Sequence, residues 1–117
     1  MKKTNPELIT LIQQLRQMSQ EHKIDIWKDI AKRLEKPGKN YPQVNLDKIQ
    51  KHLLDKETAL IPGKVLGDGE IKKIDIAAWK FSETGKKKIK EAGGKYYTIQ
   101  ELLQKNPKGK NLRIIGG

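Results

Sequence analysis

Apolar residues recur at spacings of three and four over the first third of the chain, and this pattern predicts two amphipathic helices. The first extends to about Gln20, with Thr4 or Asn5 as its cap. After a turn near residues 21–23, the second begins at about Asp25, which can cap it. Each helix has one apolar face that packs against the rest of the fold. The apolar positions are Leu8, Leu11, Ile12, Leu15 and Met18, then Ile26, Trp27, Ile30, Ala31 and Leu34.

The middle of the chain changes from helical spacing to strand character. Residues 36–43 contain two prolines, one glycine and no apolar period, which predicts a loop. Residues 44–46 suit a short strand, and residues 47–54 suit a short helix. Residues 59–66 return to strand character. The run 71–81 that follows is rich in β-branched and aromatic residues, so we expect a second strand there.

Gly67-Asp68-Gly69 lies between these two expected strands. Short glycine turns with an aspartate are common hairpin connections, and glycine permits positive φ. Taken alone, the motif therefore favours chain reversal over phosphate binding. Because Gly67 and Gly69 lack side chains and Lys64 precedes them, they remain candidates for close approach by phosphate groups.

The last third of the chain predicts two further helices, each preceded by a strand. Ser82 can cap the first of these helices, and Gly93 suits its left-handed end. Its buried face holds Gly85, Ile89 and Ala92. The remaining expected elements are a strand at 96–97, a helix from the Thr98–Glu101 capping box to about 106–107, a basic loop at 105–111 and a closing strand at 112–115.

The order strand, strand, helix recurs loosely after the two N-terminal helices, which predicts a mixed α/β fold. A chain of 117 residues with 35% apolar residues suits one domain with a modest core. We expect that domain to span residues 1–117. Its parts are N-terminal helices over about 5–35, a basic loop over 36–43, and strand and helix units over about 44–115.

Charge is the most informative feature of the composition. The chain has 25 basic residues against 14 acidic ones, a formal net charge of +11, and 22 of the basic residues are lysine. Residues 1–60 carry 12 basic and 8 acidic groups, and residues 61–117 carry 13 and 6, so the excess is not confined to a tail. Lysine acts as a point charge toward phosphate, which indicates a polyanionic partner contacted at many places.

The chain contains no cysteine, which excludes disulfides, thiolate nucleophiles and cysteine-ligated zinc and is compatible with a cytosolic protein. No run approaches the roughly 20 apolar residues of a membrane span. The polar start MKKTNPE lacks the apolar region of a signal peptide. We therefore expect a soluble, cytoplasmic protein with no membrane partner.

A catalytic or metal-binding site is not expected. His22 and His52 stand singly in charged surroundings, whereas a metal site needs several convergent ligands. The acidic residues are interleaved with lysines at close spacing, which favours surface ion pairs over an acid–base dyad. The sequence has no GxSxG, HExxH or P-loop pattern. We predict no enzymatic activity, no cofactor and no metal.

Several basic clusters are candidates for contact with RNA. The four lysines that follow Gly85 repel one another by roughly a few tenths of a kcal/mol per pair at helical spacing, and an anionic partner relieves this repulsion. Tyr41 can either stack on an unpaired base or cover the edge of the core. The candidate RNA-binding residues are Lys2, Lys3, Lys28, Lys32, Arg33, Lys36, Lys39, Asn40, Tyr41, Lys64, Gly67, Gly69, Lys86, Lys87, Lys88, Lys90, Lys108 and Lys110.

Two long stretches carry a family resemblance. PGKVLGDGE, followed after a strand by FSETGKKKIKEAGG, resembles the signature shared by the archaeal and eukaryotic large-subunit ribosomal protein eighteen and its bacterial fold relative, protein fifteen. The upstream stretch IWKDIAKRLEKPGKNYPQVNLDKI resembles only the first of these. The resemblance covers most of the chain and implies an irregular superhelix of strand, strand, helix units preceded by helices. Gly38, Asn40 and Tyr41 stand where basic residues are common in that family.

The resemblance implies a structural protein of the large ribosomal subunit that stabilises folded rRNA and acts in translation and subunit assembly. Its partners would be large-subunit rRNA and neighbouring ribosomal proteins, and the free protein would be a monomer. The alternative is a different basic RNA- or DNA-binding module, which would not prefer a folded rRNA fragment over duplex DNA. An enzyme would need a phosphate pocket at residues 67–69 beside a catalytic acid, and no second motif supports one.

Overall fold

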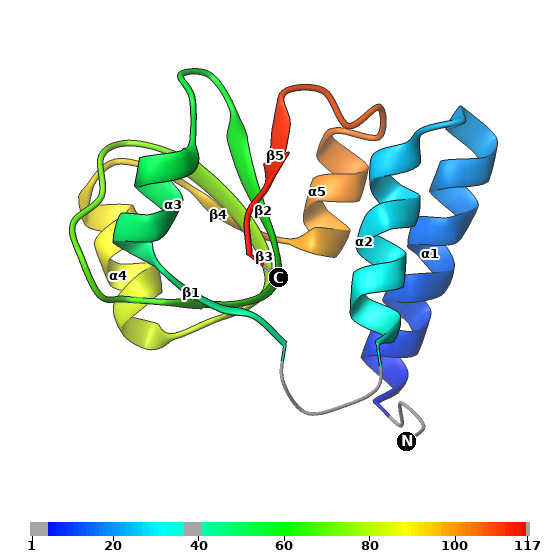
Figure 1. Ribbon diagram of the computed structural model, residues 1–117, viewed down its shortest axis with the longest axis horizontal. Helices are drawn as coiled ribbons and strands as arrows, with labels where there is room; N and C mark the ends of the chain where they lie inside the picture. Colours follow the sequence, from blue (N-terminus) through cyan, green and yellow to red (C-terminus); the bar gives the residue numbers. More distant parts are fainter. Residues whose placement is uncertain (1–4, 37–40, 117) are drawn as a thin grey trace.

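The computed structural model describes residues 5–36 and 41–116, and a parallel sheet with helices on both faces occupies its centre (Figure 1). The strands are β1 (Gln43–Asn45), β2 (Thr58–Leu66), β3 (Asp75–Phe81), β4 (Tyr96–Thr98) and β5 (Leu112–Ile114). The helices are α1 (Pro6–His22), α2 (Asp25–Glu35), α3 (Leu46–His52), α4 (Glu83–Glu91) and α5 (Ile99–Lys105). The mixed α/β fold predicted from the sequence is confirmed.

The central strand is β2, which pairs in parallel with three others. On one side β3 runs along most of its length, with Asp75 beside Thr58, and β4 pairs with the outer side of β3. The other side of β2 is shared, because β5 places Leu112 beside Thr58 and β1 places Gln43 beside Lys64. All strands therefore end at one edge of the sheet, called here the C-terminal edge, and begin at the opposite N-terminal edge.

The direction in which the chain crosses the sheet determines which face of the sheet each helix covers. From β1 to β4 the chain moves one way, with α3 and α4 on one face. It returns from β4 to β5 with α5 on the other face, beside α1 and α2 (Figure 1). Crossovers between parallel strands are right-handed in nearly all proteins, so a reversal of direction requires the opposite face.

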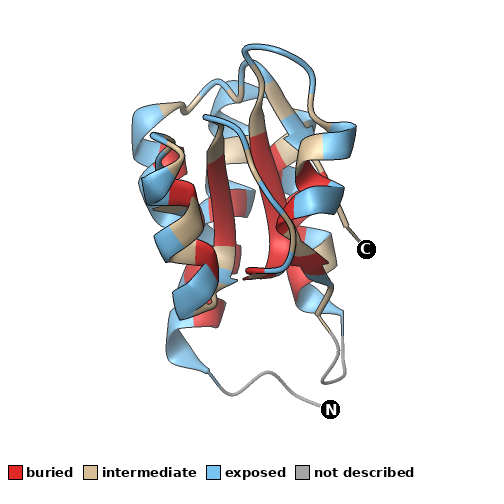
Figure 2. Cartoon of the chain, turned by 90° about the vertical axis from the view of Figure 1, so that its left-hand side faces the viewer, coloured by how far each residue is buried: buried red, intermediate tan, exposed pale blue. Residues whose placement is uncertain are grey.

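Each face of the sheet has its own apolar core. Side chains alternate along β2, so that Leu60 packs with α1, α2 and α5, whereas Ala59 and Ile61 pack with α3 and α4. In β3, Ala77 and Ile76 divide in the same way. Figure 1 places the sheet between the two helical layers, and Figure 2 shows that its central strands are buried. Burial on both faces explains why these strands are near-continuous apolar runs in the sequence.

The connection from β2 to β3, residues 67–74, contains no helix. The chain leaves β2 at Leu66 and begins β3 at Asp75, which lies beside Thr58, so the connection must retrace the whole of β2. That distance is roughly 26 Å at about 3.3 Å per residue. The nine links from Leu66 to Asp75 reach only about 30 Å when fully extended, and a helix would rise about 1.5 Å per residue. An extended chain therefore suits this connection better than a helix, and we call it the extended crossover.

The extended crossover corrects two expectations from the sequence. Because β2 and β3 are parallel, Gly67-Asp68-Gly69 is the start of a crossover and not a hairpin turn. The strand expected over 71–81 begins only at Asp75, because Ile71 and Ile74 belong to the crossover. Both isoleucines are half-buried against the core beneath α3 and α4, which explains why their sequence resembled a strand.

Glycines stand where the crossover passes the first turns of α4 and α3. A Cβ on Gly67 would lie 2.6 Å from Thr84 Cγ2 and 2.9 Å from the Gly85 nitrogen. Gly69 has a φ of +94°, and a Cβ there would lie 2.6 Å from Asp47 Cβ. Positive φ thus occurs at Gly69 and not at Gly67. Lack of space is what requires glycine at position 67.

Most of the predicted helix caps are confirmed. Asp25 is the exception: the N-cap of α2 is Ile24, and no side chain bonds to it there. Asp25 instead lies in the first turn, where the positive end of the helix dipole stabilises its carboxylate. The confirmed features are Asn5 Oδ1 accepting from Glu7 N at 2.9 Å, Ser82 Oγ accepting from Gly85 N at 3.0 Å, the Thr98–Glu101 capping box, and Gly93 with a φ of +85°.

Several element boundaries differ by a few residues from the sequence-based expectations. The first helix continues to His22, and Lys23 follows it in the left-handed conformation. Leu46 opens α3 and does not extend the preceding strand, and α3 ends at His52. Thr4, as an alternative cap, and the central residues 37–40 of the expected basic loop lie outside the described residues.

We predict that Gly67→Ala destabilises the protein by roughly 1–3 kcal/mol, because the added methyl group overpacks the start of α4. Lys87→Ala, on the exposed side of the same helix, is the control and should stay within about ±0.5 kcal/mol. Urea unfolding of both variants measures the difference. Equal stability of Gly67→Ala and the parent protein would show that the crossover does not press against α4.

Candidate nucleic-acid interface

The arginines of this chain form ion pairs with acidic residues of the same chain. The sequence contains three, and each forms an ion pair with an acidic residue of the same chain. Arg33 also donates to the backbone oxygen of Gly116 at 3.2 Å. The free positive charge of the surface therefore comes from lysine. The pairs are Arg16 with Glu35, Arg33 Nε with Asp29 Oδ1 at 3.0 Å, and Arg113 Nε with Glu57 Oε1 at 2.8 Å.

Three lysines form a stripe along α2 and its end. Lys28, Lys32 and Lys36 follow one another at intervals of four residues, so they lie on one side of the helix over roughly 12 Å. All three are exposed, and none of their side chains has an ion pair or a hydrogen bond with another residue in 5–36 or 41–116. Neighbouring Arg33 is held by Asp29. The stripe is thus a row of like charges without internal compensation.

The four lysines of α4 divide into two kinds. Lys86 Nζ lies 3.5 Å from Glu83 Oε1, and the half-buried Lys88 donates to the Gly69 backbone oxygen at 3.1 Å. Lys87 and Lys90 are exposed and have no such partner among the described residues. The lysine cluster predicted from the sequence is therefore partly structural, because Lys88 fastens α4 to the extended crossover.

The crossover is fastened to α3 as well as to α4. Asp68 N donates to Asn45 Oδ1 at 3.3 Å, and Lys72 N donates to Gln50 Oε1. Gly67 is buried against α4, and Gly69 is half-buried beside α3. The close approaches that these two glycines permit are thus made within the chain. Contact of either glycine with RNA remains a prediction.

Two exposed lysines lie on neighbouring strands near the C-terminal edge of the sheet. Lys64 on β2 is the register neighbour of Lys80 on β3, and both are exposed. The Lys80 ammonium lies 4.9 Å from the ring centre of the half-buried Trp79. Tyr41 donates its hydroxyl to the Leu34 oxygen at 3.2 Å and packs on the core, which supports the core-covering alternative given for it above. Sequence reasoning missed Lys80, because only the strand register brings it beside Lys64.

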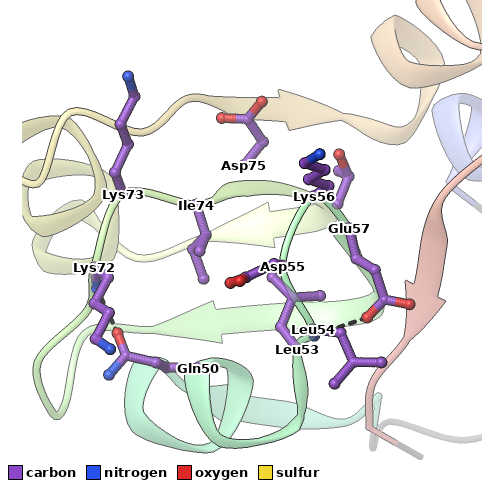
Figure 3. A pocket seen from close by; sticks show the side chains of 11 residues that line it. Gln50, Leu53, Leu54, Asp55, Lys56, Glu57, Lys72, Lys73, Ile74 and Asp75 are labelled. Carbon is purple, nitrogen blue, oxygen red and sulfur yellow. Dashed lines mark hydrogen bonds between the residues drawn. The ribbon is translucent and has the colours of Figure 1, made fainter.

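Further lysines surround a pocket of about 340 Å³ at the N-terminal edge. Figure 3 shows Lys72 and Lys73 on one side and Lys56 on the other, with apolar Ile74 between them. Acidic side chains also line this pocket, so it is mixed in charge. The sequence pattern did not indicate Lys72 and Lys73 as candidates, because residues 71–74 were expected inside a strand. The two adjacent lysines in the segment after Gly69 were the signal that could have indicated them.

The loop at residues 106–111 places two predicted lysines beside α2. Trp27 Nε1 donates to the Pro107 oxygen at 2.8 Å, which anchors the loop to the first turns of α2. Lys108 and Lys110 are exposed on this loop. They therefore lie at the same end of the molecule as Lys28, which is 80 residues earlier in the chain.

Four of the candidate RNA-binding residues have no described position. Lys2, Lys3, Lys39 and Asn40 lie outside the described residues.

Within the ranges that the structure describes, no three or more histidine, aspartate or glutamate side chains gather as a metal site would require. Over the same ranges, no helix has the length and apolar character needed to cross a membrane.

Glu57 joins three segments at the N-terminal edge. Its carboxylate accepts from Arg113 Nε at 2.8 Å and from Leu54 N at 2.8 Å, linking the start of β2 to β5 and to the preceding loop. The hydrogen bond from the Arg113 guanidinium, followed by that from Leu54, lowers the pKa of Glu57. A carboxyl group with a lowered pKa in the folded state contributes stability above its unfolded pKa, near 4.3, and loses that contribution as pH falls through the folded value.

We therefore predict that Glu57→Gln is less stable than the parent protein near pH 6, because Arg113 loses its charged acceptor. The difference should shrink as the pH falls below about 4.3. Thermal melts of both proteins from pH 6 down to pH 3 measure it. A stability difference that stays constant over this range would contradict the role given to the charged carboxylate.

Comparisons with known proteins agree in one family. The family model described as ribosomal protein 60S L18 and 50S L18e matches residues 1–117. The large ribosomal subunit protein eL18 of Methanothermobacter thermautotrophicus is 46% identical over 114 residues, 97% of this chain and 94% of that protein. The protein of the same name from Methanoregula boonei is 47% identical with the same coverage. That from Archaeoglobus fulgidus is 45% identical over 116 residues, 98% of this chain and 99% of its own length.

Proposed function

Since the chain belongs to the family of ribosomal protein 60S L18 and 50S L18e, we propose that it is a structural constituent of the large ribosomal subunit that binds rRNA through unpaired lysines. Its place of action is then the ribosome, and the free protein is a monomer. The observation that carries rRNA binding is the division of labour between the two basic residue types. The arginines form internal ion pairs, while most described lysines are exposed without an acidic partner.

The free lysines are distributed over several parts of the surface. The α2 stripe, the exposed pair on α4 and the Lys64–Lys80 pair belong to different elements of a rigid sheet and its helices. Each set can neutralise phosphates of a different RNA segment, and phosphate contacts fix position without reading sequence. The protein would thus hold RNA segments in a fixed relative arrangement, which supports assembly and translation. This role involves no chemical step.

The strongest test removes the α2 stripe. Replacing Lys28, Lys32 and Lys36 with glutamine should flatten the slope of log K against log salt for an rRNA fragment by roughly two units, at about 0.7–0.9 for each phosphate that is no longer neutralised. Titrations at several salt concentrations measure this slope. The variant should fold normally, because the three side chains have no partner among the described residues.

The control removes the same total charge from paired positions. Replacing Arg16, Arg33 and Arg113 with glutamine also lowers the net charge by three, but these side chains are held by acids of the chain. Exposed pairs contribute about 0–1 kcal/mol each, so thermal melts must first confirm that this variant is folded. Equal flattening by both triple variants would mean that net charge, and not the lysine stripe, determines binding.

Nucleic-acid preference distinguishes this function from that of a general basic module. The protein should bind a folded large-subunit rRNA fragment more tightly than duplex DNA of equal length at the same salt concentration, because its charged surfaces are spaced for a folded RNA. Competition titration with both nucleic acids measures this preference. Equal affinity for the two would favour a nonspecific RNA- or DNA-binding module.

A further inference from the structure

A groove between α1 and α5 differs in chemistry from the rest of this basic protein. It has a volume of about 480 Å³, and glutamines from both helices line it. Gln14 and Gln17 come from α1, and Gln100 and Gln104 come from α5. Half-buried Met18 contributes apolar surface to it. Glu21 is the one charged residue among the side chains that line it.

The absence of basic side chains from this lining is marked in a chain of net charge +11. Helix α1 contains a single basic residue other than histidine, Arg16, and its guanidinium is paired with Glu35 of α2. The ammonium of Lys105, at the end of α5, bonds to the Tyr97 hydroxyl. An RNA backbone placed in this groove would meet a carboxylate and no cation, so the groove is unsuited to RNA phosphates.

The groove suits a second protein for two reasons. A basic RNA-binding protein is repelled by the lysine-bearing surfaces of this one, but it meets only neutral amides and the negative Glu21 here. Each glutamine amide can donate and accept hydrogen bonds, which matches the alternating N–H and C=O groups of an extended main chain. Two hydrogen bonds within the chain already engage some of these amides, Gln100 Nε2 donating to Gln14 at 3.3 Å and Gln17 Nε2 to Glu21 at 3.0 Å. These exposed bonds can exchange for bonds to a partner.

We propose that the α1–α5 groove binds an extended, lysine- or arginine-bearing segment of a neighbouring ribosomal protein. The lysine surfaces contact RNA, and this groove faces a protein. The proposal rests on the function proposed above, because it places the chain inside the large subunit. It names one occupant, and RNA in the same place is the competing outcome.

Charge substitutions of opposite sign distinguish the two occupants. Gln17→Lys with Gln104→Lys should be released from purified large subunits at lower salt than the parent protein, because two positive charges repel a basic segment. Gln17→Glu with Gln104→Glu should be released at equal or higher salt. If the groove faces RNA, both signs reverse. Reversed signs, or no change in either variant, would overturn the proposal.

Photo-crosslinking in assembled subunits identifies the neighbour directly. A photoreactive amino acid at position 17 or 104 should crosslink to a lysine- or arginine-bearing peptide of one ribosomal protein, identified by mass spectrometry. The same group at position 87, on the exposed face of α4, should crosslink to rRNA. Crosslinks to rRNA from positions 17 and 104, or none, overturn the groove assignment. If the tagged protein fails to enter large subunits at all, the proposed function and this inference fail together.

Discussion

The short return of the chain from β2 to β3 is the constraint on which the rest of the structure depends. Nine links must return the chain to the start of a nine-residue strand, which leaves little room for a helix, and the crossover contains none. It passes directly against the first turns of α3 and α4, where Gly67 and Gly69 leave space for it. The hydrogen bond from Lys88 to Gly69 and the core packing of Ile71 and Ile74 hold it there. Both glycines stand in the stretch that carries the family resemblance, and a Cβ at either position would clash with α3 or α4.

The fold determines which charged side chains have a partner within the chain and which do not. Ion pairs of the three arginines join α1 to α2, one turn of α2 to the next, and β5 to the start of β2. Lys86 and Lys88 are likewise held by groups of the chain. What the fold leaves unpaired is a set of lysines on rigid elements, while the α1–α5 groove has none. A protein that must contact both RNA and other basic proteins needs both kinds of surface.

Local patterns predicted much of the fold, and long-range geometry accounts for the errors. The spacing of Leu8 to Met18 and the side chains of Asn5, Ser82 and Thr98 identified helices, because capping and amphipathicity act within a few residues. Strand direction is set by partners distant in sequence, so the parallel pairing of β2 and β3 could not be read from Gly67-Asp68-Gly69. That error concealed Lys72 and Lys73 in a supposed strand. In the candidate interface, lysine positions were predictable, but the partners that remove Lys88 and the arginines from it were visible only in three dimensions.

Differential amine modification can show whether the lysines unused by the fold are those that meet RNA. The free protein and purified large subunits are treated with the same amine-reactive reagent, and modification at each lysine is measured by mass spectrometry. We expect Lys28, Lys32, Lys87 and Lys90 to react readily in the free protein and to be protected in the subunit, whereas Lys88 should react slowly in both. Equal reactivity of those four lysines in the two states would contradict this expectation.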